Sequence, residues 1–147
     1  MTSFEECIQF ANEHKICSVS TVEGNRPHVR IQGMWFADKD GFHFSTLNTK
    51  AVYHQLAENP RIEVCFYAPP ERPFGQGGST DLGTMMRVSG EVTFINDEHM
   101  KERLLEDRPL LRPRADKQII FRIRSGEAWF WTAQDDGHEG AIERMRF

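Results

Sequence analysis

The segment at residues 26–50, RPHVRIQGMWFADKDGFHFSTLNTK, constrains the fold of this chain more than any other. It predicts a long strand, a tight Asp-Lys-Asp-Gly connection, a second strand, and then a helix that opens beside hydroxyl side chains and a lysine. Free backbone N–H groups and the positive end of the helix dipole attract an anion at a helix N-terminus. Thr46, Thr49 and Lys50 add hydroxyl donors and a positive charge there. The segment is therefore suited to holding a phosphate, and a phosphate beside an extended strand suits a nucleotide-like cofactor.

The other apolar runs predict further strands joined by short links. Strands are expected at residues 16–22, 28–36, 42–46, 61–67, 85–95, 118–124 and 127–132, with a short last one within residues 141–147. Residues 42–46 are expected to pair back on residues 28–36, and Ser125-Gly126 is interpreted as a hairpin turn. Helices are expected after the Ser3-x-x-Glu6 capping box, at residues 50–58, and from the cap Asp97 to Asp107. This mainly β pattern predicts an antiparallel barrel with peripheral helices.

Length and charge limit the possible classes of protein. A chain of 147 residues is expected to form one domain, residues 1–147. A net charge of −4 and a pI near 5.9 argue against a nucleic-acid partner. No apolar run approaches the roughly 20 residues of a membrane span, and the acidic start MTSFEECIQF is unlike a secretory signal. The expected protein is cytoplasmic, without a membrane partner.

Cysteines and histidines show no spacing typical of metal ligands. Cys7, Cys17 and Cys65 are far apart and form no Cys-x-x-Cys pair, and a free cysteine in an apolar strand usually behaves as a small buried hydrophobe. The six histidines form no His-x-x-x-His pair. No metal site is predicted.

Two irregular segments remain open to interpretation. Residues 68–84, APPERPFGQGGSTDLGT, are too long for a routine hairpin and lack the lysine and the strand-to-helix context of a P-loop, so they are interpreted as a surface flap. Residues 108–114, RPLLRPR, are most simply a solvated basic loop, with binding of an anionic substrate or a nicotinamide phosphate as the weaker alternative.

Three runs in order carry a resemblance to a known family: CSVSTVEGNRPHVRIQGMWF, FHFSTLNTKAVYHQLAENPRIEVCFY and MRVSGEVTFI. The most specific parts are the N-T-K-x₅-L-x₂-N-P-R pattern at residues 48–61 and the R-V-S-G at residues 87–90. Over roughly residues 15–131 the chain resembles the pyridoxamine 5'-phosphate oxidase-like, FMN-binding split-barrel superfamily. It is most similar to the short members, including the nitroimidazole-resistance reductase type.

The resemblance implies an antiparallel split β-barrel that forms a homodimer, with FMN in a groove between the two subunits. It implies that the flavin ring lies along the strand of Val29, Arg30, Ile31 and Gln32. It also implies that the phosphate lies at Ser45, Thr46, Thr49 and Lys50, where the residues themselves already point to Lys50. Arg87, in the R-V-S-G motif, is a further predicted contact.

The aromatic run Trp129-Phe130-Trp131 places large apolar groups on both faces of one strand. It indicates a buried strand, or else a dimer face or a wall of the flavin groove, and Trp131 is the predicted cofactor contact. The chain departs from the true oxidase in having Met85 in place of a glutamine and in lacking its C-terminal Arg/His pair. These departures disfavour oxidation of pyridoxamine phosphate.

Two functions follow as expectations. The first is a small FMN-dependent oxidoreductase that uses a reduced nicotinamide or similar donor and a small-molecule substrate. The second is a non-catalytic flavin or haem binding or sensing module, and the deazaflavin F420 is an alternative cofactor because related barrels use it. The flap at residues 68–84 is expected to cover the substrate side of the flavin, or else to be a loop without a role.

Overall fold

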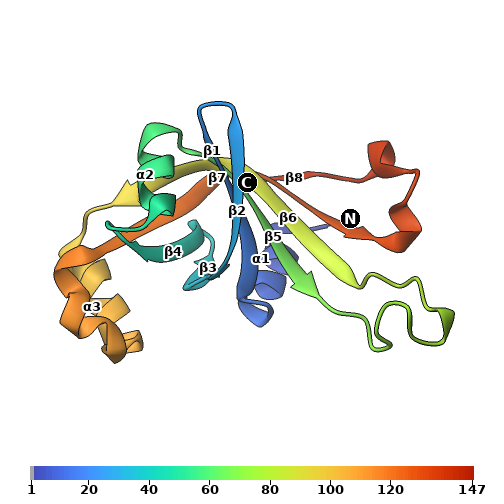
Figure 1. Ribbon diagram of the computed structural model, residues 1–147, viewed down its shortest axis with the longest axis horizontal. Coiled ribbons are helices and arrows are strands. Elements are labelled where there is room, and N and C mark those ends of the chain that lie inside the picture. Colours follow the sequence, from blue (N-terminus) through green and yellow to red (C-terminus); the bar gives the residue numbers. More distant parts are fainter. Residues whose placement is uncertain (1) are drawn as a thin grey trace.

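The computed structural model describes residues 2–147 as one curved antiparallel sheet of eight strands with helices around it (Figure 1). The strand order is β2-β1-β5-β6-β7-β4-β3, with β8 added on β7. The strands are β1 Ile16–Glu23, β2 Arg26–Gly33, β3 Phe36–Asp38, β4 Gly41–Leu47, β5 Arg61–Ala68, β6 Thr84–Ile95, β7 Gln118–Thr132 and β8 Met145–Arg146. The α-helices are α1 Phe4–Glu13, α2 Ala51–Glu58 and α3 Glu98–Asp107.

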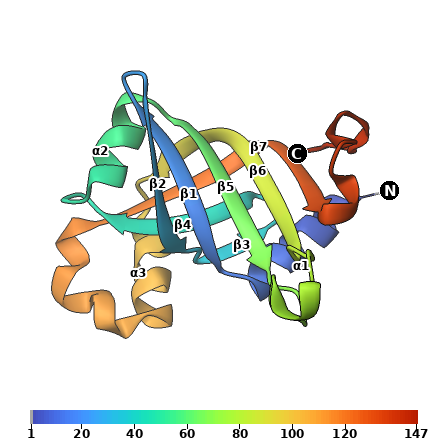
Figure 2. The same cartoon turned by 45° about the vertical axis from the view of Figure 1, so that its right-hand side comes forward.

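The sheet curves into a barrel that is left open along one seam (Figure 2). The strands on either side of this seam, β2 and β4, are not backbone partners in the sheet. A side chain links them instead, because Gln32 Nε2 donates to the carbonyl oxygen of Ser45 at 3.1 Å. The predicted antiparallel split barrel with peripheral helices is confirmed.

The barrel interior is filled by large side chains from alternate strand positions. In β1 the buried residues Cys17, Val19 and Thr21 alternate with more exposed ones, as the two-residue repeat of a strand requires. The largest fully buried side chains include Phe42, Phe44, Phe66, Phe121 and Met86. Burying each such side chain stabilises the fold by about 1.5–3 kcal/mol relative to exposure.

The predicted hairpin at Ser125-Gly126 is wrong, since β7 runs unbroken through both residues. Gly126 lies directly opposite Gly90 in β6, at the irregularity where the two long strands bend. A Cβ atom on Gly126 would lie 2.2 Å from the carbonyl oxygen of Ser89. This glycine therefore permits close approach of two backbones rather than a chain reversal.

The predicted strand at residues 28–36 is two strands. Its first part belongs to β2 and pairs with β1, whereas Phe36 begins β3 and pairs with β4. Between them Met34 and Trp35 are both buried, which breaks the alternation of a strand. Their amides donate to Lys15 O at 2.8 Å and His43 O at 2.9 Å, so the chain passes from one end of the sheet to the other here. Pairing of residues 42–46 with this segment is correct only for β3.

Several local predictions are confirmed. Ser3 and Glu6 form the capping box of α1, and the Asp97 carboxylate accepts the amides of His99 and Met100 at the start of α3. The tight connection between β3 and β4 is present, with Asp38 Oδ1 accepting from the amide of Asp40 at 2.8 Å. No helix in residues 2–147 has the length and apolar character to cross a membrane.

Candidate functional site

A pocket of about 370 Å³ lies at the seam between β2 and β4, and we call it the seam pocket. The start of α2 and the 3₁₀ segment Pro109–Lys117 complete its walls. Its lining residues are Arg30, Ile31, Gln32, Gly33, Ser45, Thr46, Leu47, Lys50, Val52, Arg108, Leu111, Arg114 and Gln118.

Hydrogen bonds hold the Arg30 guanidinium in a fixed position on β2. One nitrogen donates to Thr21 Oγ1 at 2.7 Å and another to the Gln55 amide oxygen on α2. Burial lowers the pKa of Arg30, but an arginine stays protonated at neutral pH. None of its hydrogen-bond partners is a carboxylate, so its positive charge remains available to an anion in the pocket.

The pocket carries positive charge without a counter-charge. Arg30, Lys50, Arg108 and Arg114 line it, and none of its lining residues is a carboxylate. Lys50 is exposed at the N-cap of α2, where its side chain makes no capping hydrogen bond. An anionic ligand is the group that this set of side chains is suited to bind.

One buried polar atom in the wall lacks a partner. Gln118 is only 7% exposed, and its Nε2 has no hydrogen-bond partner in the described part of the chain. Leaving a buried donor unpaired costs about 1–3 kcal/mol, so a ligand that offers an acceptor would gain from meeting it.

The structure brings together six of the predicted site residues in this pocket. They are Arg30, Ile31, Gln32, Ser45, Thr46 and Lys50. Thr46 is buried in β4 and Ser45 is half-buried beside it. Four predicted residues lie outside the pocket lining: Val29, Thr49, Arg87 and Trp131.

Arg87 forms an ion pair on the outer face of the sheet and does not line the seam pocket. Its guanidinium pairs with the Glu63 carboxylate on β5 and lies 5.1 Å from the centre of the Trp129 ring. The strand register places Ile31, Cys65, Arg87 and Trp129 in one row on the outer face of the sheet. Trp131 lies in a neighbouring row of the same face, opposite Met85.

A comparison with protein families decides the wider relationship. The family model of pyridoxamine 5'-phosphate oxidase matches residues 3–132. The chain belongs to the pyridoxamine 5'-phosphate oxidase family. The resemblance found in the sequence is thereby confirmed. Among curated proteins, no sequence matches the chain significantly.

Solved structures share the fold of this family member at low sequence identity. A NimC/NimA family protein from Clostridium acetobutylicum is 21% identical with a TM-score of 0.73, covering 100% of this chain and 95% of its own. An FAD-binding protein from Mesorhizobium loti is 15% identical with a TM-score of 0.64, covering 90% and 96%. HutZ, the haem storage protein of Vibrio cholerae, is 14% identical with a TM-score of 0.62, covering 84% and 90%.

Sequence reasoning missed three of the pocket's polar residues in this pyridoxamine 5'-phosphate oxidase family member. Arg108 and Arg114 belong to the basic segment for which a solvated loop is the simplest interpretation and anion binding the weaker alternative, and Gln118 begins a strand. Arg108 reaches the seam because its guanidinium donates to the carbonyl oxygen of Met34 at 3.1 Å. The basic composition of the segment indicates that it can bind an anion, but which part of the sheet it faces depends on contacts between residues far apart in the chain.

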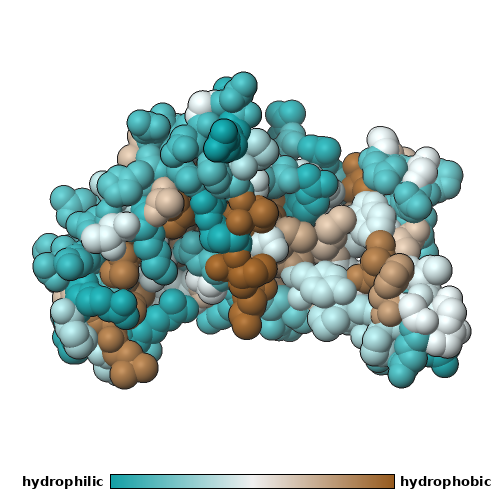
Figure 3. Space-filling model, in the orientation of Figure 1, coloured by the Kyte–Doolittle hydropathy of each residue, from teal (hydrophilic) through white to brown (hydrophobic). Residues whose placement is uncertain are grey.

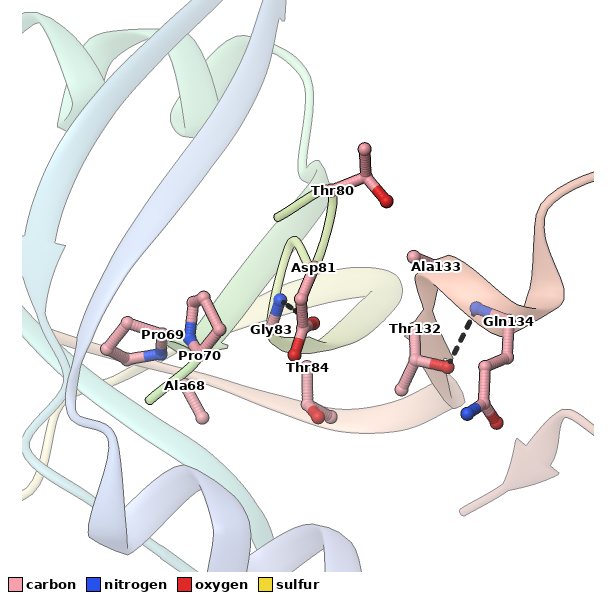
Figure 4. A pocket seen from close by; sticks show the side chains of 10 residues that line it. All are labelled: Ala68, Pro69, Pro70, Thr80, Asp81, Gly83, Thr84, Thr132, Ala133 and Gln134. Carbon is pink, nitrogen blue, oxygen red and sulfur yellow. Dashed lines mark hydrogen bonds between the residues drawn. The ribbon is translucent and has the colours of Figure 1, made fainter. Parts of the chain in front are cut away.

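The flap forms a second pocket, of about 580 Å³, at the far end of β5 and β6 (Figure 4). Its walls come from both ends of the flap and from the end of β7: Ala68, Pro69, Pro70, Thr80, Asp81, Gly83, Thr84, Thr132, Ala133 and Gln134. The two pockets have no lining residue in common. The flap lies at the opposite end of the molecule from α2 and α3 (Figure 1), so its role over a flavin stays a prediction that requires a second subunit.

The cysteines behave as predicted for small hydrophobes. Cys7 and Cys17 are buried and Cys65 is half-buried, all as free thiols. Burial raises the pKa of Cys17 to about 12, which leaves it an unreactive thiol at neutral pH. Within residues 2–147, no three His, Cys, Asp or Glu side chains cluster closely enough to hold a metal ion.

Proposed function

We propose that this protein binds FMN at the seam pocket and acts as a small flavin-dependent oxidoreductase in the cytoplasm. The observation that carries the proposal is the group of four cations without a carboxylate beside the exposed strand β2. A flavin, when bound, supplies hydride and single-electron chemistry, and a reduced nicotinamide or similar compound is the proposed donor. The fold of the FAD-binding protein from Mesorhizobium loti is consistent with such a cofactor.

The side chains of the seam have separate roles in this proposal. Lys50, Ser45 and Thr46 bind the phosphate through one charge and two hydroxyl groups. Arg30 is already oriented by Thr21 and Gln55, so binding an acceptor atom costs it little side-chain entropy. Gln32 links the two strands of the seam, because its amide nitrogen donates to the carbonyl oxygen of Ser45. Its polar side chain lies at the edge of β2.

A homodimer is part of the proposal because the outer face of β1 and β2 is unusually apolar. Three aliphatic side chains on this face are largely exposed: Ile16 at 73%, Val29 at 72% and Ile31 at 68%. Tyr67, on the same face, is 47% exposed. Figure 3 shows hydrophobic surface gathered along the middle of this side of the molecule, where Figure 1 places β2. Pairing two such faces would remove apolar area from water and bring Arg87 and Trp131 of one subunit toward the other's seam.

Haem binding is the second candidate, because HutZ has the same fold. Haem iron takes its axial ligand from histidine, cysteine, methionine or tyrosine. The lining of the seam pocket, as described, contains none of these residues. The donor set therefore favours a flavin over haem.

Reconstitution tests the proposal directly. Apo-protein titrated with FMN, with F420 and with haem in a calorimeter is expected to bind FMN with micromolar or better affinity. The loaded protein should show the two flavin absorbance bands and should oxidise NADH or NADPH when an acceptor is present. Haem binding with a Soret band and no affinity for FMN would replace the proposal by the haem-binding candidate.

A further inference from the structure

The positively charged side chains of the seam pocket come from two separate parts of the chain. Arg30 and Lys50 come from β2 and the start of α2, whereas Arg108 and Arg114 come from the 3₁₀ segment and the residue before it. None of the four takes part in an ion pair with another described residue. A single phosphate carries at most two negative charges, so one phosphate in this pocket would leave part of the charge of the four cations uncompensated.

The unpaired amide of Gln118 lies on the border between two pockets. Gln118 lines the seam pocket and also an adjoining pocket of about 220 Å³. Its Nε2 is buried and without a partner among the described residues. Because buried donors are nearly always paired, this nitrogen points to a ligand acceptor at the passage from one pocket to the other.

The adjoining pocket has walls suited to a planar heteroaromatic ring. Tyr53 and Phe94 form one side, with their ring centres 5.4 Å apart. Apolar and polar residues complete it: Ile95, Asn96, Asp97, Lys101, Gln118, Ile119 and Ile120. Tyr53 follows Lys50 by one turn of α2, so the start of this helix borders both pockets. Aromatic walls bind bases by stacking, and the amide of Asn96 offers both a donor and an acceptor.

We infer that the two pockets together take FAD, with a second phosphate toward Arg108 and Arg114 and the adenine between the walls of the Tyr53–Phe94 pocket. This inference rests on the proposed function, since FAD contains the FMN unit and keeps its contacts at Lys50. The added half of the molecule supplies a second anionic group for the second pair of cations. It also supplies ring nitrogens and ribose oxygens that can accept from Gln118.

Comparing the two flavins on the same apo-protein tests the inference. Calorimetric titration is expected to give a dissociation constant for FAD at least tenfold lower than that for FMN, the scale of one stacked base. Replacing Tyr53 with Ala should remove most of this difference and leave FMN affinity unchanged. The matched control is Phe74→Ala, since Phe74 is an aromatic residue that is 64% exposed and lines neither pocket, and this variant should retain the full preference for FAD.

A second pair of variants tests the phosphate half independently of α2. Arg114→Gln should weaken FAD several-fold more than FMN. Arg112→Gln is its control, because Arg112 lies in the same segment but pairs with Glu102 at 2.9 Å outside the pocket. FMN binding as tight as FAD, or a preference for FAD that survives both Tyr53→Ala and Arg114→Gln, overturns the inference and leaves the proposed function intact. Binding of neither flavin overturns both.

Discussion

At the scale of single residues, Lys50 is the side chain on which the phosphate proposal depends most. It is exposed, makes no capping bond to α2, and lines the seam pocket. Lys50→Ala should weaken FMN binding by about 1–3 kcal/mol, the range for a hydrogen bond to a charged group. Calorimetry measures the change, and Lys39→Ala, in the exposed turn after β3, is the control that should leave affinity unaltered. Equal FMN affinity in Lys50→Ala and the wild type, with both folded by circular dichroism, would remove Lys50 from the site.

His43 makes stability depend on pH. It is 2% exposed and stacks on Phe36 with ring centres 4.1 Å apart. Burial lowers its pKa below the ordinary 6.5, with Arg122 acting in the same direction, while Asp38, Asp40 and a backbone hydrogen bond with Phe36 only partly oppose this. The unfolded chain therefore binds a proton at a higher pH than the folded chain does.

The expected result follows from that sign. Stability contributed by neutral His43 is present above pH 6.5 and falls as the pH drops from there toward the lowered pKa of the folded state. Denaturant unfolding at pH 7.5 and pH 5.5 should show a larger loss in the wild type than in His43→Phe, which keeps an aromatic ring against Phe36. Parallel losses in the two proteins would show that other groups control the acid sensitivity.

At the scale of elements, Gly90 and Gly126 allow the backbones of the two longest strands, β6 and β7, to approach closely where these strands bend. A methyl group on Gly126 would meet Ser89 O at 2.2 Å, and that oxygen belongs to the backbone and cannot move aside. Gly126→Ala should lower the free energy of unfolding by about 1–3 kcal/mol, as overpacking does. Gly140→Ala is the control, because a Cβ there has no neighbour within 4 Å. Equal denaturation midpoints for the two variants would contradict the close approach.

The features of the elements that the sequence predicts correctly depend on residues that are close together in the chain. The alternation of residues 16–22, the Asp38–Gly41 connection and the cap at Asp97 each depend on residues within one turn or one hairpin. The sequence predicts a turn at Gly126 because Ser-Gly is a local turn signal, whereas the partner that keeps Gly126 in a strand, Gly90, is distant in the chain. The break at Met34 and Trp35 is likewise set by contacts to Lys15 and His43.

The residues of the seam pocket likewise fall into a group that the sequence predicts and a group that it does not. Lys50 and the hydroxyl residues before it lie next to one another in the chain, so one motif indicates them together. Arg108 and Arg114 reach β2 only after α3 and the 3₁₀ segment fold back, and no local pattern encodes which strand a basic segment will face. The family match adds the fold but does not place these two arginines.

At the scale of the whole molecule, the seam pocket and the apolar outer face meet on β2. Arg30 and Gln32 line the pocket, whereas Val29 lies on the outer face. One strand thus borders both the proposed cofactor and the proposed subunit contact. Loss of the dimer is expected to loosen the flavin, because the ring would then face water along one side.

A charge placed at the centre of this face should separate the subunits without altering the pocket lining. Val29→Lys buries an unpaired ammonium group in the proposed interface, which costs several kcal/mol unless the subunits part. Sedimentation velocity at micromolar concentration should show a dimer for the wild type and a monomer for Val29→Lys, with weaker FMN binding in the variant. Leu110→Lys is the matched control: Leu110 is 89% exposed and belongs to the 3₁₀ segment rather than to a strand of the sheet, and its variant should stay dimeric. A wild-type protein that sediments as a monomer with FMN bound would contradict the shared groove, and the flavin would then be held by the seam pocket alone.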